Sequence, residues 1–312
     1  MTMSEFVDRI LENMKTVMVA KQEVLELALV GVLCGGHILI EDVPGIGKTT
    51  MASALAKSLG CSFGRIQCTP DLLPSDITGI HFFNQKTSEF EYRPGPVIAN
   101  IVLVDEINRA TPRTQSSLLE CMQEQQVTVD GVTMPLPKPF MVIATQNPVE
   151  LQGTFPLPEA QLDRFLMKLV LGYPNIEDED VLLLRFERSN PLDHLSAVTL
   201  ASEIVDMRRQ AQEIYVEPSV RRYILEITSR TRTDPNVTLG CSPRASLALY
   251  RASQGLALIR GRDFVIPDDV KRLAIPVLGH RLILSTEAYL HNNSKEELIA
   301  DIVSSLPVPA EE

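Results

Sequence analysis

The chain contains no tryptophan, and only 5% of its 312 residues are aromatic. Proteins that hold single-stranded nucleic acid usually stack the bases on aromatic side chains, so this scarcity counts against such a role. Positive charge is also in deficit, because 29 Lys and Arg stand against 40 Asp and Glu, a net charge of −11. Neither half of the chain, divided at Gly172, is basic. We therefore expect no nucleic-acid partner and no large surface that attracts anionic lipid.

Cysteine and long apolar runs are scarce as well. The five cysteines are odd in number and none lies in a C-x-x-C spacing, so we expect reduced thiols without a disulfide framework or a zinc ribbon. The longest apolar stretch, 27–40, is interrupted by Gly35-Gly36 and is short for a membrane span. The first residues lack the layout of a signal peptide. These features predict a cytoplasmic protein with no integral membrane segment.

The chain does contain enough hydrophobic residues, 45%, to bury real cores. Its first part alternates short apolar runs with amphipathic stretches, a pattern typical of a parallel sheet between helices. Buried strands are expected at 37–41, 65–68, 101–106, 140–148 and 165–173. Helices are expected at 4–14, 21–34, 51–60 and 111–126, and hairpins at 80–92 and 127–134.

After Pro174 the pattern becomes helical throughout, and we place a domain boundary near 173–176. The helices are expected at 175–189, 198–214, 217–231, 242–261 and 266–282. The predicted fold is thus an α/β P-loop core over 1–173, followed by a small all-α domain over 174–312.

The stretch DVPGIGKT, 42–49, nearly matches the phosphate-binding pattern G-x-x-x-x-G-K-[ST] and lies between a predicted strand and a predicted helix. Lys48 would reach the β- and γ-phosphates, and the Thr49 hydroxyl would bind Mg²⁺. The loop and the start of its helix would cradle the nucleotide through Pro44, Gly45, Ile46, Gly47, Lys48, Thr49 and Thr50.

The pattern departs from the consensus at Asp42, where glycine is usual. A carboxylate ~8 Å from a phosphate charge would cost about 2 kcal/mol at an effective dielectric near 20. We therefore expect Asp42 to point away from the nucleotide, since the turn itself depends on Gly45 and Gly47.

Two neighbouring strand ends carry the remaining polar chemistry. The apolar run at 101–104 ends in Asp105 and Glu106, which are expected to bind Mg²⁺ and to deprotonate the attacking water, respectively. Asn147 follows the next buried strand, where its amide could hold both water and γ-phosphate. Two arginines could add positive charge. Arg164 directly precedes the last strand, and Arg244 lies in the first turn of a helix that Ser242 and Pro243 begin.

In this order the motifs resemble those of AAA+ ATPases, and the nearest resemblance is to the MoxR family. The segments that carry it are "RIQCTPDLLPSDITG" (65–79), "EYRPGPVIANIVLVDEINRATPRTQSSLLECMQE" (91–124), "VIATQNPVELQGTFPLPEAQLDRF" (142–165) and "LGCSPRA" (239–245). The resemblance implies an αβα core with two hairpin insertions, a helical lid, and a ring that is usually hexameric. It also implies ATP and Mg²⁺ as ligands.

Residue roles follow from the same resemblance. Asn147 corresponds to sensor 1, Arg164 to an arginine finger that acts on the neighbouring subunit, and Arg244 to a sensor-2 arginine that acts in its own subunit. Val19 and Ala20 would lie by the adenine, and Ala20 stands where relatives often have glycine.

The family further implies a chaperone-like motor that matures or remodels a client protein, often with a von Willebrand factor A domain partner. Two other classes stay open: a slow nucleotide-dependent switch or scaffold, and, with less support, a nucleic-acid motor or chelatase-like subunit.

Overall fold

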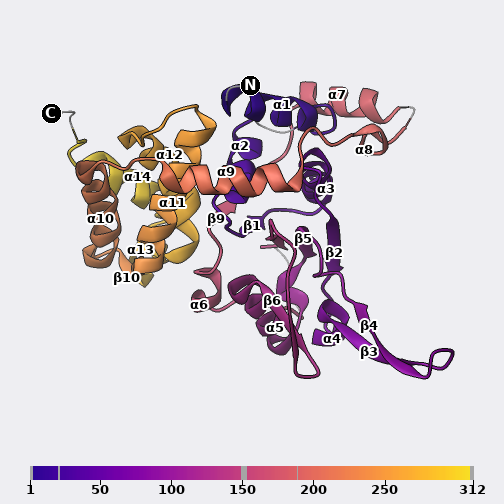
Figure 1. Cartoon of the computed structure of the whole chain (residues 1–312). Helices are drawn as coiled ribbons and strands as arrows, with labels where there is room; N and C mark the ends of the chain where they lie inside the picture. The colour runs from indigo at the N-terminus through magenta and orange to yellow at the C-terminus, as the bar shows by residue number, and fades with distance from the viewer. Residues whose placement is uncertain (1–2, 20–21, 149–152, 188, 310–312) are drawn as a thin grey trace.

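The computed structural model describes residues 3–19, 22–148, 153–187 and 189–309. Its centre is a parallel sheet in the order β2-β5-β8-β1-β9 (Figure 1). The strands are β1 (Ile38–Glu41), β2 (Phe63–Gln67), β5 (Ile101–Asp105), β8 (Met141–Gln146) and β9 (Met167–Leu169). All five predicted strands are therefore confirmed, and because they are parallel, their carboxyl ends share one edge of the sheet.

Alternate side chains of the strands enter two separate cores, as expected for a sheet that is buried on both faces. Ile38, Ile40 and Ile143 belong to one core, whereas Leu39, Val104 and Val142 belong to the other. Helices that pack around these cores include α1 (Met3–Lys15), α2 (Gln22–Leu33) and α3 (Lys48–Ser58) in the first, and α4 (Pro74–Thr78) and α5 (Pro112–Glu124) in the second. A short 3₁₀ turn, η1 (Ile107–Arg109), follows β5.

Both predicted hairpins are confirmed. Strands β3 (Gly79–Asn84) and β4 (Glu89–Pro94) pair antiparallel and project from the body of the molecule (Figure 1). Strands β6 (Gln126–Val129) and β7 (Val132–Pro135) form the second, shorter hairpin after α5. A short helix, α6 (Glu159–Leu162), precedes β9.

Helices dominate the remainder of the chain, as expected. They are α7 (Ile176–Phe186), α8 (Pro191–His194), α9 (Ala201–Glu213), α10 (Pro218–Thr233), α11 (Pro243–Ile259), α12 (Pro267–Leu278), α13 (Thr286–Leu290) and α14 (Lys295–Ser305), with the 3₁₀ turn η2 (Gly279–Arg281). This region is not purely helical, because β10 (Val237–Leu239) and β11 (Ile283–Leu284) pair within it. No helix in the described ranges is long and apolar enough to cross a membrane.

The helical region shares its core with the sheet region. Buried residues of α9, α11, α12 and α14 belong to the same hydrophobic cluster as α1, α2 and one face of the sheet. Charged contacts add to this packing: the buried carboxylate of Glu26 on α2 accepts hydrogen bonds from Arg260 and Arg272 at 2.9 and 3.0 Å. The helical region is therefore fixed against α2 and β9.

Candidate nucleotide site

The predicted phosphate loop connects β1 to α3 at the carboxyl edge of the sheet. Gly45 and Gly47 both have φ of +88°, a conformation that other residues rarely adopt, and Gly47 immediately precedes α3. A Cβ added at Gly45 would meet nothing within 4 Å, so this side of the loop is open. α3 begins directly after this turn without a side-chain cap, and the unpaired N–H groups of a helix N-terminus are suited to bind an anion.

Lys48 is the first residue of α3, and its ammonium group donates a 2.7 Å hydrogen bond to the main-chain carbonyl of Asp42. Partial burial lowers the pKa of Lys48, while the carboxylates of Asp42, Asp105 and Glu106 act in the opposite direction. The lysine is thus held across the loop, beside the acidic strand end. Thr49 and Thr50 follow it in the first turn of the helix.

Asp42 is buried, and its carboxylate is turned away from the open side of the loop, as expected. One carboxylate oxygen accepts a hydrogen bond from the N–H of Val43 and the other from the N–H of Gly172, at 2.9 and 2.8 Å. The residue at the irregular position therefore links the end of β1 to the chain that leaves β9.

The acidic pair lies at the end of β5, two strands away from the loop in the sheet order. The buried carboxylate of Asp105 accepts hydrogen bonds from Arg65 at 2.8 Å and from Thr145 at 3.3 Å. Hydroxyl and carboxylate oxygens are the ligands that Mg²⁺ prefers, so Asp105 and Thr49 fit the predicted metal chemistry. Because the Arg65 side chain is half-exposed, moving its guanidinium away from Asp105 would place this charge in solvent and not in the protein interior.

Glu106 has a φ of +56°, a conformation that is uncommon for a residue with a side chain and that often occurs at functional sites. Its N–H donates to the Thr145 hydroxyl at 2.9 Å. Its carboxylate is held by Gln67 at 3.3 Å and by Arg109 at 3.0 Å. The backbone bond and the two side-chain contacts fix both the strained turn and the direction of the carboxylate.

Sequence reasoning missed these supporting residues. Gln67 and Thr145 lie on the strands that flank β5: Gln67 pairs in register with Asp105, and Thr145 directly follows Ala144, the register partner of Val104. A sheet order would have revealed them, because residues at matching positions of adjacent strands meet. Asn147 follows β8 at this same edge and is half-buried.

The two predicted arginines lie near the amino ends of the strands, at the edge of the sheet opposite to the phosphate loop. Arg164 donates to the carbonyl of Leu119 in the middle of α5, at 3.4 Å, and its Nε finds no partner among the described residues. Two residues after it, the N–H of Leu166 bonds to the carbonyl of His37, which directly precedes β1. The length of β1, about 13 Å at ~3.3 Å per residue, therefore separates Arg164 from its own phosphate loop.

Arg244 lies at this far edge too. Its guanidinium is 3.7 Å from the carboxylate of Asp163, which also accepts hydrogen bonds from Ser242 and Arg281, each at 2.9 Å. The action of Arg244 in its own subunit stays a prediction, and in this structure its guanidinium lies beside Asp163. The helical region docks beside β9 through Arg281 and Asp163, and so carries Arg244 away from the loop of the same chain.

The adenine contacts are described only in part. Val19 is half-buried and directly follows Met18, whose methyl group lies 3.8 Å from the place where a Cβ on Gly47 would be. This arrangement places Val19 at the entrance of the loop. Ala20 lies outside the described residues.

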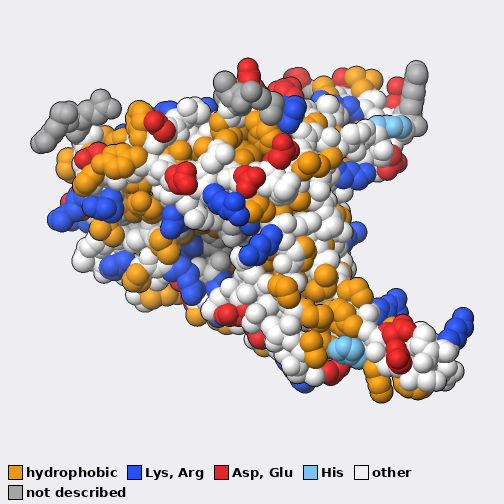
Figure 2. Space-filling model, viewed as in Figure 1, with side chains coloured by type: hydrophobic (Ala, Val, Ile, Leu, Met, Phe, Trp, Pro, Cys, Tyr) orange, Lys and Arg blue, Asp and Glu red, His pale blue; other side chains and the backbone are white. Residues whose placement is uncertain are grey.

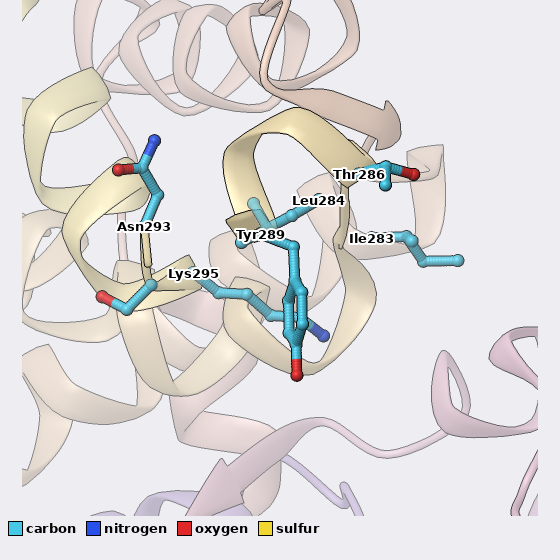
Figure 3. A pocket seen from close by; sticks show the side chains of 7 residues that line it. Ile283, Leu284, Thr286, Tyr289, Asn293 and Lys295 are labelled. Carbon is cyan, nitrogen blue, oxygen red and sulfur yellow. The ribbon is translucent and has the colours of Figure 1, made fainter. Parts of the chain in front are cut away.

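One surface cavity, of about 470 Å³, lies in the helical region and contains none of the predicted site residues (Figure 3). Its lining combines apolar side chains, such as Ile283 and Leu284, with polar ones, such as Thr286 and Lys295. The candidate site is instead the open edge formed by the phosphate loop and the ends of β5 and β8.

Comparisons with known proteins agree with this arrangement. Residues 37–167 match a family profile described as ATPase family associated with various cellular activities (AAA), and residues 229–302 match the AAA lid domain. Chaperone MoxR1 of Mycobacterium tuberculosis is 40% identical over 97% of this chain and 82% of its own length. The chain belongs to the MoxR family of AAA ATPases.

Two further relatives of this MoxR-family chain cover nearly all of it. The uncharacterized protein YeaC of Bacillus subtilis is 52% identical over 96% of the chain and 94% of YeaC. The crystal structure of a Cytophaga hutchinsonii protein, titled as an ATPase, superposes on this chain with a TM-score of 0.93 and 37% sequence identity. The alignment with it covers 99% of this chain and 96% of that one. The AAA core and helical lid are thus those of the family.

Proposed function

We propose that this MoxR-family protein hydrolyses ATP in a ring of identical chains, six in the usual form of the family, and uses the energy to mature or remodel client proteins. The observation that carries the proposal is the division of the charged residues between two edges of the sheet. The phosphate loop, Asp105 and Glu106 lie at one edge, whereas Arg164 and Arg244 lie at the other.

The hydrolytic step would depend on positioning and charge stabilisation. Lys48 and the loop N–H groups would hold the β- and γ-phosphates, and Asn147 would orient the attacking water. Glu106 would take the proton of this water as its oxygen attacks the γ-phosphorus and the bond to the leaving ADP oxygen breaks. Mg²⁺, held by Thr49 and Asp105, would neutralise charge on the phosphates when bound.

Arg164 and Arg244 would complete the site of the neighbouring chain. Both lie at the edge of the sheet opposite to their own loop, and Asp163, the residue before Arg164, pairs with Arg244 at 3.7 Å. Arginine fingers are worth about 10³–10⁵ in rate in related systems. Turnover by this chain should therefore depend on assembly.

The work output rests on family membership. The name of Chaperone MoxR1, 40% identical, supports a chaperone-like role on a protein client. We include in the proposal a partner protein with a von Willebrand factor A domain, as expected from the family. A turnover assay with and without such a partner separates this motor from a slow nucleotide switch.

A mixing experiment tests whether the arginines act between chains. Lys48→Ala chains cannot hold ATP but keep both arginines, and Arg164→Ala chains keep the loop but lack the finger. Each variant alone should be nearly inactive. Randomly mixed rings place an intact loop against an intact arginine at roughly a quarter of the contacts, and so should recover a substantial part of the parent rate. Mixed rings that assemble without any recovery would refute the trans assignment.

A further inference from the structure

Helix α7 exposes an apolar surface to solvent. None of its eleven residues, all of which are described, is buried. Ile176, Leu183 and Leu184 are 83%, 69% and 63% exposed, and Val181, Leu182 and Phe186 are also more than a third exposed. Single exposed apolar residues are normal on protein surfaces, but a contiguous group of this kind marks an interaction site. Figure 2 shows hydrophobic side chains beside acidic ones where α7 lies.

The position of α7 connects this surface with the nucleotide site. The guanidinium of Arg185 on α7 donates to the main-chain carbonyls of Lys15 and Met18, at 2.6 and 3.1 Å. Met18 in turn lies against Gly47 of the phosphate loop. The exposed helix is therefore attached to the segment that borders the loop, at the edge of the sheet where a neighbouring chain would deliver its arginines.

A second exposed surface in the helical region includes Arg244. On α11, Leu247 is 57% exposed and lies one turn after Arg244, so the two side chains share a face of the helix. Leu239 on β10 is 45% exposed, and Arg232 donates to the carbonyl of Cys241 close to it. We call these four residues, Arg232, Leu239, Arg244 and Leu247, the lid patch.

The charges of the two surfaces are complementary. The first turn of α7 carries Glu177, Asp178 and Glu179, whereas the lid patch combines its two leucines with two exposed arginines. Lys and Arg side chains gather over the helical region in Figure 2. Opposite charges around an apolar centre are typical of specific protein contacts.

We propose that α7 of one chain docks on the lid patch of the next copy of this chain. This inference rests on the proposed function, because the same contact would bring Arg164 and Arg244 to the phosphate loop. The two surfaces are different parts of the chain, so the contact is head-to-tail and can repeat around a closed ring. α7 then binds the lid of the neighbouring chain, and the apolar side chains of α7 are buried only in the assembly.

Cross-linking tests the contact directly. A Leu183→Cys, Leu247→Cys double variant, treated with a bis-maleimide during assembly with ATP, should give a ladder of covalent oligomers on a denaturing gel. Each single variant should stay at one chain. Burial raises the pKa of the native Cys34 and Cys61 thiols to about 12 and about 11, which keeps background labelling slow. A double variant that assembles but gives no ladder would overturn the proposal.

A charged residue in the apolar surface provides the second test. Leu183→Asp should shift the protein concentration needed for assembly upward at least tenfold, whereas the matched control Leu183→Met should stay within twofold of the parent. Turnover per chain should fall in step with assembly and recover at high protein concentration. Circular dichroism checks that both variants fold. Parent-like assembly of a folded Leu183→Asp chain would mean that α7 binds something other than a second copy.

The proposed function and the proposed α7 contact can be refuted independently of each other. Assembly of the Glu106→Gln chain, measured by light scattering, reports on the α7 contact without any turnover. If mixed rings recover no activity but Leu183→Asp still weakens assembly, the trans action of the arginines is refuted and the docking of α7 on the lid patch is supported.

Discussion

The carboxylate of Asp42 accepts a 2.8 Å hydrogen bond from the backbone N–H of Gly172, a residue 130 positions later in the chain. One residue thus joins the phosphate loop to the segment that leads from β9 to α7. The first glycine of the usual phosphate-binding pattern could not make this contact, because glycine has no side chain. Asp42 therefore has a structural role that is independent of phosphate binding.

Asp42→Gly should lower stability more than it alters ATP binding. The change removes the acceptor of two backbone N–H groups, and hydrogen bonds to charged groups contribute about 1.5–3 kcal/mol. The Lys48 ammonium keeps its partner, since this is the main-chain carbonyl at position 42. We expect urea unfolding to show a loss of about 2 kcal/mol, with the ATP dissociation constant within about threefold of the parent. Asp42→Asn keeps one acceptor and should lie between the two; a large change in affinity would contradict this interpretation.

Glu106→Gln should bind ATP and fail to hydrolyse it. Glutamine has nearly the same shape and can keep the contacts with Gln67 and Arg109, but it cannot take a proton from water. General-base catalysis typically contributes about 10²–10⁴ in rate, and we expect a loss of this size in single-turnover hydrolysis. The affinity for a fluorescent ATP analogue should be unchanged. Undiminished hydrolysis would show that another group is the base.

Arg281→Ala should detach the helical region from the sheet. The buried Arg281 donates to the Asp163 carboxylate and to the carbonyls of Phe165, Leu166 and Val277. Removing one partner of a buried ion pair typically costs about 3–5 kcal/mol. Urea unfolding should show this loss or a second transition for the helical region. Arg209→Ala is the matched control, because Arg209 pairs with Asp206 on the surface, and its removal should cost less than about 1 kcal/mol.

Stability should fall in mild acid because His37 is buried in its neutral form. Its Nδ1 accepts from the N–H of Val142 at 3.0 Å, so a proton there would break this bond. Burial lowers the pKa of His37 from 6.5 to about 4. The unfolded chain binds the proton first as the pH falls, and stability is therefore lost between about pH 6.5 and 4 and not regained below.

The size of this loss follows from the shift, at about 1.4 kcal/mol per pKa unit, and is on the order of 3 kcal/mol. His37→Asn keeps an acceptor for Val142 but does not titrate, so its unfolding free energy should vary less between pH 7 and pH 5. Equal pH dependence of the two proteins would show that His37 does not contribute. His280, whose pKa burial also lowers, should add a loss of the same sign in both.

Much of the fold could be predicted because its signals are local. The apolar runs of β5 and β8, the glycines of the phosphate loop and the Asp130-Gly131 turn each specify their own element. The acidic pair was also recognisable, since it ends a buried strand. Short elements such as α4, α6 and β10 were missed, because a few residues without periodicity carry no such signal.

The position of the helical region could not be predicted in this way. Sequence spacing placed Arg244 at the start of a helix, but only contacts between distant residues decide which side of the sheet that helix meets. Arg281 with Asp163 and Arg260 with Glu26 are such contacts, and each joins residues more than a hundred positions apart. Two partners of Glu106, Gln67 and Thr145, were hidden for the same reason, because the sheet order brings their strands beside β5.

The separation of the two arginines from their own loop has a consequence for how activity would depend on closure. If the arginines serve only the next chain, an open row leaves its first loop without arginines and its last arginines without a loop. Such a row has one working site fewer than it has chains, and closing the row restores the missing site without adding material. Specific activity would then report the fraction of closed assemblies. A chain that cannot accept a neighbour would keep any row that contains it open, and would thereby lower the specific activity of that assembly.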